Sequence, residues 1–247
     1  MCVSRYYRIP HPFYHMNRNV TRDNHTRSNR EERTVFNPYH NVEMQRHILW
    51  RTTMAYIQPG VYEMKNGESV KIRTAHTSDA TEMRKLTKEV IKEDVGLILT
   101  EDEYTFTVRE QAQRVYNSLY SPYHLLITAL HGGTLCGIAS FEPEQPIKKM
   151  RHHGHIGLIV AKPYRSLGLG RHLMETIVDW AKKQETINKV SLEVLTNNEP
   201  AIALYLNIGF EPVGCFHNHI LQSDGTYADV YRMELITSTT AFQPGDK

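Results

Sequence analysis

The chain has 247 residues, enough for one large domain or two small ones with a hydrophobic core. Hydrophobic residues make up 40% and charged residues 23%, as in an ordinary soluble globular protein, and no apolar run approaches the ~20 residues of a membrane span. Cys2, Cys136 and Cys215 form no CxxC pair, and their spacing is typical of neither a disulfide framework nor a zinc site, so we expect reduced thiols in a cytoplasmic protein.

The net charge of +2 hides an asymmetry along the chain. Residues 1–53 contain nine arginines, no lysine and four acidic residues, whereas the remainder is mildly acidic. This acidity argues against nucleic acid as a partner of the main domain. Because residues 1–60 show no helical or strand period and no compact apolar segment, we predict a flexible or disordered Arg-rich extension rather than a secretory signal. Residues 61–240 are then expected to form one domain, followed by a tail at 241–247.

Strands and helices alternate after this extension. Residues 69–75 are predicted to form a strand, and residues 78–93 a helix in which Asp79 and Glu82 are spaced as a capping box. A second helix is predicted over 107–120. Two apolar runs, at 123–130 and 134–142, flank the tripeptide HGG, which indicates a β-hairpin.

The second half of the chain continues this pattern. We predict a strand at 155–161, an amphipathic helix at 168–184, a strand at 189–196, a helix at 199–208 and a final strand within 224–236. The hairpins and the single strand–helix–strand unit predict an α/β (α+β) sandwich, in which helices flank both faces of a mixed, mostly antiparallel sheet.

The stretch RSLGLGRHL, residues 165–173, lies between a predicted strand and a predicted helix. Backbone N–H groups at a helix start have no acceptor within the helix and carry about half a positive charge. Gly168 and Gly170 allow this backbone to approach an anion, and Arg165 and Arg171 can add positive charge, so the loop fits a phosphate group. A Walker A loop would need Gly-Lys-Ser/Thr, and a Rossmann fingerprint would need a third glycine where Leu173 stands, so both motifs are disfavoured.

At this loop the sequence resembles the GCN5-related N-acetyltransferase (GNAT) superfamily, whose acetyl-CoA motif Gln/Arg-x-x-Gly-x-Gly/Ala is met by residues 165–170. A second signature, Asn-x-x-Ala-x-x-Leu-Tyr-x-x-x-Gly-Phe, is met by residues 198–210, and the tail is similar to the ribosomal-protein and polyamine acetyltransferase branch. The resemblance covers roughly residues 68–237. It implies a GNAT fold whose central sheet is splayed open between the strands at 155–161 and 189–196.

The resemblance also implies how acetyl-CoA, the expected co-substrate, is held. The CoA diphosphate is expected on the loop formed by Arg165, Ser166, Leu167, Gly168, Leu169, Gly170 and Arg171, with the backbone N–H groups of 167–171 in contact. The pantetheine arm is expected to pair like an added strand with the backbone of Leu158, Ile159 and Val160. Asn198 is expected either to contact CoA or to cap the following helix.

The inferred reaction moves an acetyl group from a thioester to an amine. Deprotonating a lysine-like amine at pH 7 costs ~4–5 kcal/mol, so a general base is expected. Tyr205 lies where the family has its thiolate-protonating tyrosine, and its alternative role is packing. His155, where related sequences often have Glu, Glu142 and a water chain are the alternatives for the base. The resemblance places the oxyanion at a backbone N–H near Ile159 or Val160.

We therefore expect an acetyl-CoA-dependent N-acetyltransferase that acts by direct attack in a ternary complex. The acceptor is expected to be a small amine or polyamine, a protein N-terminus or a lysine, attracted by Glu101, Asp102 and Glu103 if these are not simply a solvated loop. The alternative function is a non-catalytic acyl-CoA-binding regulatory module. No metal is expected. Successive side chains of a strand point to opposite faces of the sheet, so His152, His153 and His155 cannot all point to one ion. The sequence is compatible with a homodimer, and no membrane partner is expected.

Overall fold

The structure, a computed structural model, describes residues 55–94, 96–144 and 147–238. The predicted extension therefore lies almost entirely outside the described residues, and so does the predicted tail at 241–247. Gly60, the last residue of the predicted extension, is the first residue of a strand. In the described part of the chain, no helix is both long enough and apolar enough to cross a membrane.

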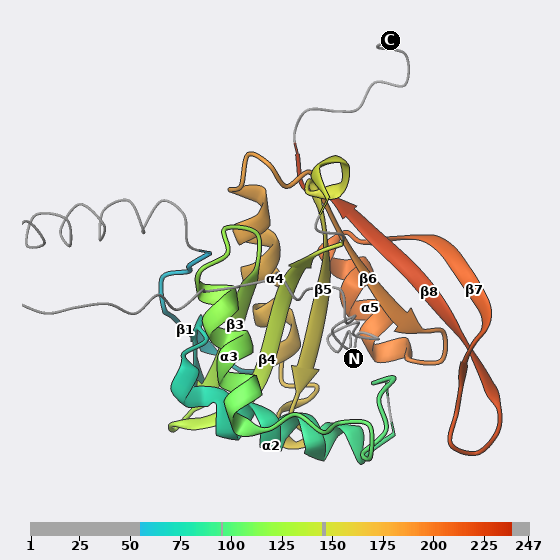
Figure 1. Cartoon of the computed structure of the whole chain (residues 1–247), viewed down its shortest axis with the longest axis horizontal. Helices are drawn as coiled ribbons and strands as arrows, with labels where there is room; N and C mark the ends of the chain where they lie inside the picture. Colours follow the sequence, from blue (N-terminus) through green and yellow to red (C-terminus); the bar gives the residue numbers. More distant parts are fainter. Residues whose placement is uncertain (1–54, 95, 145–146, 239–247) are drawn as a thin grey trace, which may run out of the picture. The chain divides into compact units, whose positions relative to one another are not determined.

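Eight strands form a single mixed sheet (Figure 1), and six of them lie close to the positions predicted from the sequence. Its spatial order is β1-β2-β3-β4-β5-β6-β8-β7. All neighbouring strands are antiparallel except β5 and β6, which are parallel. The strands are β1 (Gly60–Glu63), β2 (Ser69–Thr74), β3 (Leu125–His131), β4 (Thr134–Pro143), β5 (His153–Val160), β6 (Lys189–Leu195), β7 (Glu211–Leu221) and β8 (Tyr227–Ile236).

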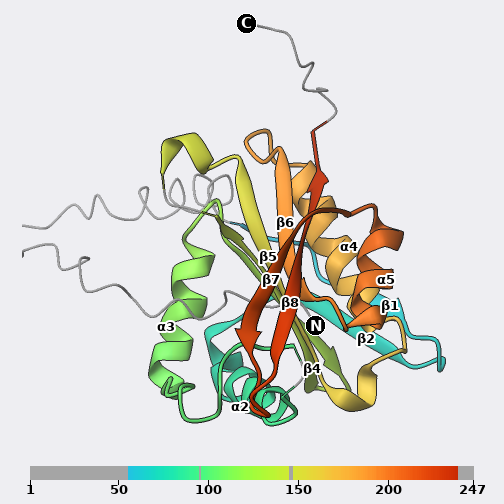
Figure 2. The same cartoon turned by 90° about the vertical axis from the view of Figure 1, so that its right-hand side faces the viewer.

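Four described α-helices cover the sheet, two on each face, as expected for the sandwich (Figure 2). Helices α2 (Ala80–Ile91) and α3 (Val108–Leu119) lie on one face, and α4 (Leu169–Lys182) and α5 (Glu199–Ile208) lie on the other. The apolar stripe of α4 faces the sheet and forms much of the core, through the buried side chains of Leu169, Leu173, Met174, Ile177, Val178 and Ala181.

Two local predictions need correction. Strand β1 was not predicted, because a run of four residues with no long alternation carries little strand signal. The capping box at the start of the first helical segment joins His76 and Asp79, not Asp79 and Glu82. The Asp79 carboxylate accepts the His76 backbone N–H at 2.8 Å and pairs with Arg73 at 2.7 and 2.8 Å, so it is not available to cap α2.

The sheet opens between β5 and β6. These parallel strands pair only at their first residues, from His153 opposite Lys189 to His155 opposite Ser191. By contrast, β5 pairs with β4 along its whole length, and β6 pairs with β8 along its whole length. β5 therefore stays paired with β4, and β6 stays paired with β8, while the pairing between β5 and β6 ends after three residues. This is the splay that the family resemblance implied (Figure 1).

Candidate functional site

A groove of about 850 Å³ lies at the opening between β5 and β6. This volume is within the range of small-molecule and cofactor sites. Its walls come from the ends of β5 and β6, the loop before α4, the first turn of α4, most of the length of α5, and the end of β1 with the turn after it. Predicted site residues that line it are Leu158, Val160, Arg165, Ser166, Leu167, Gly168, Gly170, Arg171, Asn198 and Tyr205.

The glycine loop presents the open end of α4 to this groove. Gly168 is the N-cap of the helix, with φ 89°, and no side chain caps the helix start. This left-handed conformation favours glycine because a Cβ is strained there. The first helical backbone bond runs from His172 N–H to Gly168 O at 3.2 Å, so the preceding N–H groups have no acceptor within the helix. The arrangement is that of an anion-binding site.

The turn between β1 and β2 holds this loop in place. The backbone N–H of Lys65 donates to Leu167 O at 3.0 Å, and His172 Nε2 lies 3.2 Å from Glu63 O. The side chain of Lys65 passes close to Gly168 and lines the groove, which adds a cation beside the loop. Lys65 was not predicted as a site residue, because it lies 100 residues before the motif and only the fold brings the two together.

The two predicted arginines are already engaged by acidic side chains. Arg165 makes a bidentate ion pair with Glu93, in which Nη2 lies 2.9 Å from Oε1, and its Nε donates to Val160 O at 3.0 Å. Arg171 lies 3.2 Å from Glu175, one turn further along α4. Arg165 therefore ties the end of β5 to the segment after α2, while Arg171 remains half-exposed at the groove.

Alternate residues of β5 direct their backbone N–H and C=O groups to opposite edges of the strand. Ala161 N–H donates to Cys136 O, and Glu144 N–H donates to His153 O, so the odd-numbered residues of β5 bond to β4. Ile159 therefore directs its backbone polar groups at β4, opposite Ile138. Leu158 and Val160 direct theirs toward the splay, where no strand pairs with them. Of the three predicted strand residues, these two have the geometry to pair with an extended ligand.

Tyr205 and Asn198 both belong to α5. Tyr205 is fully buried, lines the groove and packs edge-on against Phe210. Asn198 is the N-cap of the helix, because its side chain accepts the Ala201 backbone N–H at 3.4 Å, and it also lines the groove. The predicted role of Asn198 as a cap is therefore confirmed, and its position leaves a cofactor contact available.

The predicted bases, Glu142 and His155, are register partners across β4 and β5. The neighbouring Phe141 packs on Trp180 of α4, whereas the charge of Arg114 on α3 acts on Glu142, so this pair lies on the face of the sheet that α2 and α3 cover. His124 Nε2 lies 3.4 Å from Glu142 Oε1. Burial raises the pKa of Glu142, but the hydrogen bond and charge of His124, with Arg114 and His155, outweigh burial, so the pKa lies below its usual value. A carboxylate that is ionised at neutral pH can accept a proton.

A second polar group lies beside them on the same face. His153 and Ser191 are hydrogen-bonded at 2.9 Å, and Arg232 of β8 lies 3.3 Å from Ser191 and 3.5 Å from Glu193. Burial and the Lys189 charge lower the pKa of His153 to about 4, so its imidazole is neutral at physiological pH. Glu193, a buried carboxylate two residues past the last β5–β6 pair, was not predicted as a site residue. Its signal was a single acid inside the apolar strand KVSLEVL.

The predicted acidic cluster is held within its own loop. Thr100 bonds to Asp102 and to Glu103, while Glu101 pairs with Lys92 at 3.1 Å. Residues 96–100 nevertheless share a small cavity with residues 220–223 at the tip of the β7–β8 hairpin. The linker between α2 and α3 and the tip of the β7–β8 hairpin therefore lie next to each other.

Comparisons with known proteins match this architecture. A model of the acetyltransferase (GNAT) family matches residues 93–210. The N-alpha-acetyltransferase RimI of Mycobacterium tuberculosis is 34% identical over 116 residues, which cover 47% of this chain and 68% of RimI.

Solved structures share the fold. A GNAT acetyltransferase from Streptococcus pneumoniae aligns with a TM-score of 0.65 at 28% identity, over 68% of this chain and 99% of that one. A putative acetyltransferase from Salmonella typhimurium, solved with its cofactor acetyl-CoA, aligns with a TM-score of 0.61 at 16% identity, over 71% of this chain and 98% of that one.

Proposed function

Because this chain is an acyltransferase of the GNAT family, in its RimI-like branch, we propose that it transfers an acetyl group from acetyl-CoA to a primary amine. The amine attacks the thioester directly while both substrates are bound. A protein N-terminal amine is the first acceptor to test, since a relative with 34% identity is an N-alpha-acetyltransferase. A small amine or polyamine, or a lysine, would use the same chemistry.

The observation that carries the proposal is the groove between the open helix start and the unpaired edge of β5. The N–H groups at residues 167–171 suit the CoA diphosphate, and Lys65 adds positive charge beside them. The backbone of Leu158 and Val160 suits the amide-containing pantetheine arm, which would complete the interrupted ladder. This arrangement directs the thioester into the splay.

Acid and base would then approach the thioester from opposite faces of the sheet. Tyr205 reaches the groove from the α5 side, where its hydroxyl can protonate the departing thiolate. His155, Glu142 and Glu193 lie on the other face, where an incoming amine would lose its proton. A protein α-amine has a pKa near 7.8, so deprotonating it at pH 7 costs only about 1 kcal/mol, against ~4–5 kcal/mol for lysine.

Thiol release from acetyl-CoA, measured against peptides with a free N-terminus, matched N-blocked peptides, lysine peptides and polyamines, tests this proposal. We expect turnover that depends on an unblocked amine. Tight acetyl-CoA binding without turnover on every acceptor would contradict the proposal and favour a non-catalytic acyl-CoA-binding module.

Tyr205→Phe tests the acid. We expect kcat to fall at least about tenfold with little change in acetyl-CoA affinity, because the lost hydroxyl acts on the leaving thiolate. Tyr231→Phe, a change on β8 outside the groove lining, is the matched control. Equal turnover of Tyr205→Phe and the wild type would remove Tyr205 from the mechanism.

A further inference from the structure

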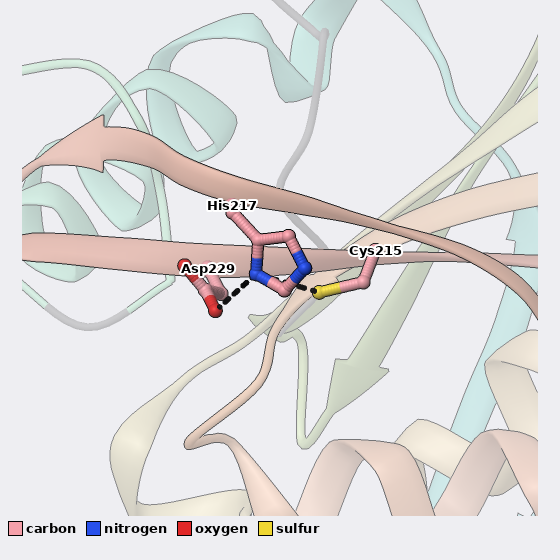
Figure 3. A group of neighbouring side chains, drawn as sticks. All are labelled: Cys215, His217 and Asp229. Atoms are coloured by element: carbon pink, nitrogen blue, oxygen red, sulfur yellow. Dashed lines mark hydrogen bonds and ion pairs between the residues drawn. The ribbon is translucent and has the colours of Figure 1, made fainter.

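A cysteine, a histidine and an aspartate converge on the β7–β8 hairpin, outside the groove lining. Cys215 Sγ lies 3.9 Å from His217 Nδ1, and His217 Nδ1 lies 2.9 Å from Asp229 Oδ2. All three potential ligand atoms lie within 4.8 Å of one another (Figure 3). Cys215 is partly buried and His217 is 77% exposed, so solvent can reach the cluster.

An irregularity in β7 creates this convergence. Phe216 pairs with Val230 and Ile220 pairs with Ala228, so three residues of β7 lie opposite the single residue Asp229. Asn218 at the centre of this bulge has φ 50°. Bulges re-aim side chains, and this one turns His217 toward the neighbouring strand. The trio has no recognisable signature in the sequence, since its third member lies 12 residues after His217.

The geometry argues against a nucleophilic Cys–His–Asp triad. In such a triad the imidazole bridges the two partners, with one nitrogen toward the thiol and the other toward the carboxylate. Here the thiol and the carboxylate both approach Nδ1 of His217. Three potential donor atoms of different chemistry within 4.8 Å of one another are instead compatible with a metal site.

We infer that Cys215, His217 and Asp229 bind a divalent cation of the zinc class, with solvent in the fourth position. Tetrahedral zinc with sulfur at about 2.3 Å and nitrogen or oxygen at about 2.0 Å has donor–donor separations of about 3.3–3.5 Å. The observed separations are 2.9 Å between Nδ1 and Oδ2 and 3.9 Å between Nδ1 and Sγ, and Sγ and Oδ2 lie within 4.8 Å, so side-chain rotations would close the trio around the ion. A thiolate with an imidazole disfavours Mg²⁺ and Ca²⁺, which prefer oxygen ligands.

The surroundings of Asp229 fit a ligand role. Its Oδ1 accepts the Asn218 backbone N–H at 2.7 Å, which orients the carboxylate and leaves Oδ2 for the cation. Its backbone oxygen accepts the Thr196 N–H at 3.0 Å, and Asn197 and Asn198, the next residues, line the groove. A bound cation would therefore fasten β7 to β8 beside one wall of the groove.

The test uses the reduced full-length chain after chelator treatment. Co²⁺ alone is added first, because a cysteine thiolate that binds Co²⁺ produces a charge-transfer band in the near ultraviolet. Zn²⁺ affinity is then measured by competition with a chromophoric chelator. We expect one Co²⁺ per chain with that band, and displacement of Co²⁺ by Zn²⁺.

Variants assign the site. Cys215→Ser should abolish the band, and Cys215→Ser, His217→Ala and Asp229→Asn should each weaken Zn²⁺ binding by more than about tenfold, since even outer-sphere changes cost about 10–100-fold. Asp229→Asn keeps an oxygen for the Asn218 N–H, and circular dichroism checks that each variant folds.

Three matched controls separate this site from other ligands. His219→Ala changes the next histidine of the bulge, which stacks on Phe216 and is not in the trio. Cys136→Ser changes a buried thiol whose pKa burial raises to about 11, and Cys2→Ser changes the remaining cysteine. All three should bind like the wild type. Absence of the band, or a band and affinity that survive in Cys215→Ser, would overturn the inference.

Discussion

Single residues at the start of α4 set the conditions for anion binding. Gly168 has φ 89°, and a Cβ there would meet only Cγ of Lys65, at 3.9 Å, so the fold would accommodate a side chain there at the cost of backbone strain. Gly133, in the β3–β4 turn, has φ 87° and no atom within 4 Å of the position of a Cβ, and it does not line the groove. The two glycines therefore separate backbone strain from ligand binding.

Gly168→Asp should weaken acetyl-CoA binding by at least about tenfold, because it adds bulk and negative charge where the diphosphate is proposed to lie. Gly133→Asp introduces the same side chain at nearly the same φ and should leave the affinity within about twofold. Isothermal titration of both variants with acetyl-CoA checks this. Equal affinities would count against the proposed position of the diphosphate.

Among the elements, β5 is hydrogen-bonded to β4 on one edge, whereas on its other edge the pairing with β6 ends before the second half of the strand. The edge toward which each backbone N–H points predicts which amides respond to the cofactor. In hydrogen exchange followed by NMR, the N–H groups of Leu158 and Val160 should gain protection when acetyl-CoA is added. The N–H of Ile159, directed at β4, should be protected with and without it. The same gain at all three residues, or none, would contradict the pairing.

Elements whose boundaries depend on neighbouring residues could be predicted from the sequence. The helix at 199–208 could be predicted with its Asn198 cap and Gly209 end, and the glycine loop could be placed between a strand and a helix, because each depends on neighbouring residues. The opening between β5 and β6 was predicted from the family resemblance and not from a local sequence signal.

Long-range contacts were not predictable in this way. The pairing of Arg165 with Glu93, the approach of Lys65 to the loop and the location of Glu193 near Arg232 join residues that no local pattern links. The same holds for Asp79, which would suit a cap of α2 but is engaged by Arg73.

At the scale of the whole molecule, the polar network on the α2–α3 face makes stability depend on pH. The pKa of His153 is about 4 in the folded chain, because burial and the charges of Lys189 and Arg232 outweigh those of Glu144 and Glu234. The unfolded imidazole titrates near 6.5. The unfolded state therefore binds more protons between these values, so the free energy of unfolding falls as pH drops from about 6.5 to about 4.

Urea unfolding at pH 7 and near pH 4 measures this loss, to which His153 contributes on the order of 3 kcal/mol. His153→Gln removes the titrating ring and should flatten the pH dependence by a similar amount. His219→Gln, a change at an exposed histidine, should leave the slope as in the wild type. An unchanged slope in His153→Gln would show that other groups carry the acid sensitivity.

The proposed function requires the open start of α4 to hold the diphosphate of acetyl-CoA and to direct the thioester into the gap between β5 and β6. A crystal structure of the chain with acetyl-CoA bound measures this directly. We predict diphosphate oxygens at about 3 Å from backbone nitrogens within residues 167–171, with the pantetheine arm along Leu158 and Val160. A diphosphate bound elsewhere, with the glycine loop closed against neighbouring side chains, would contradict this role of α4.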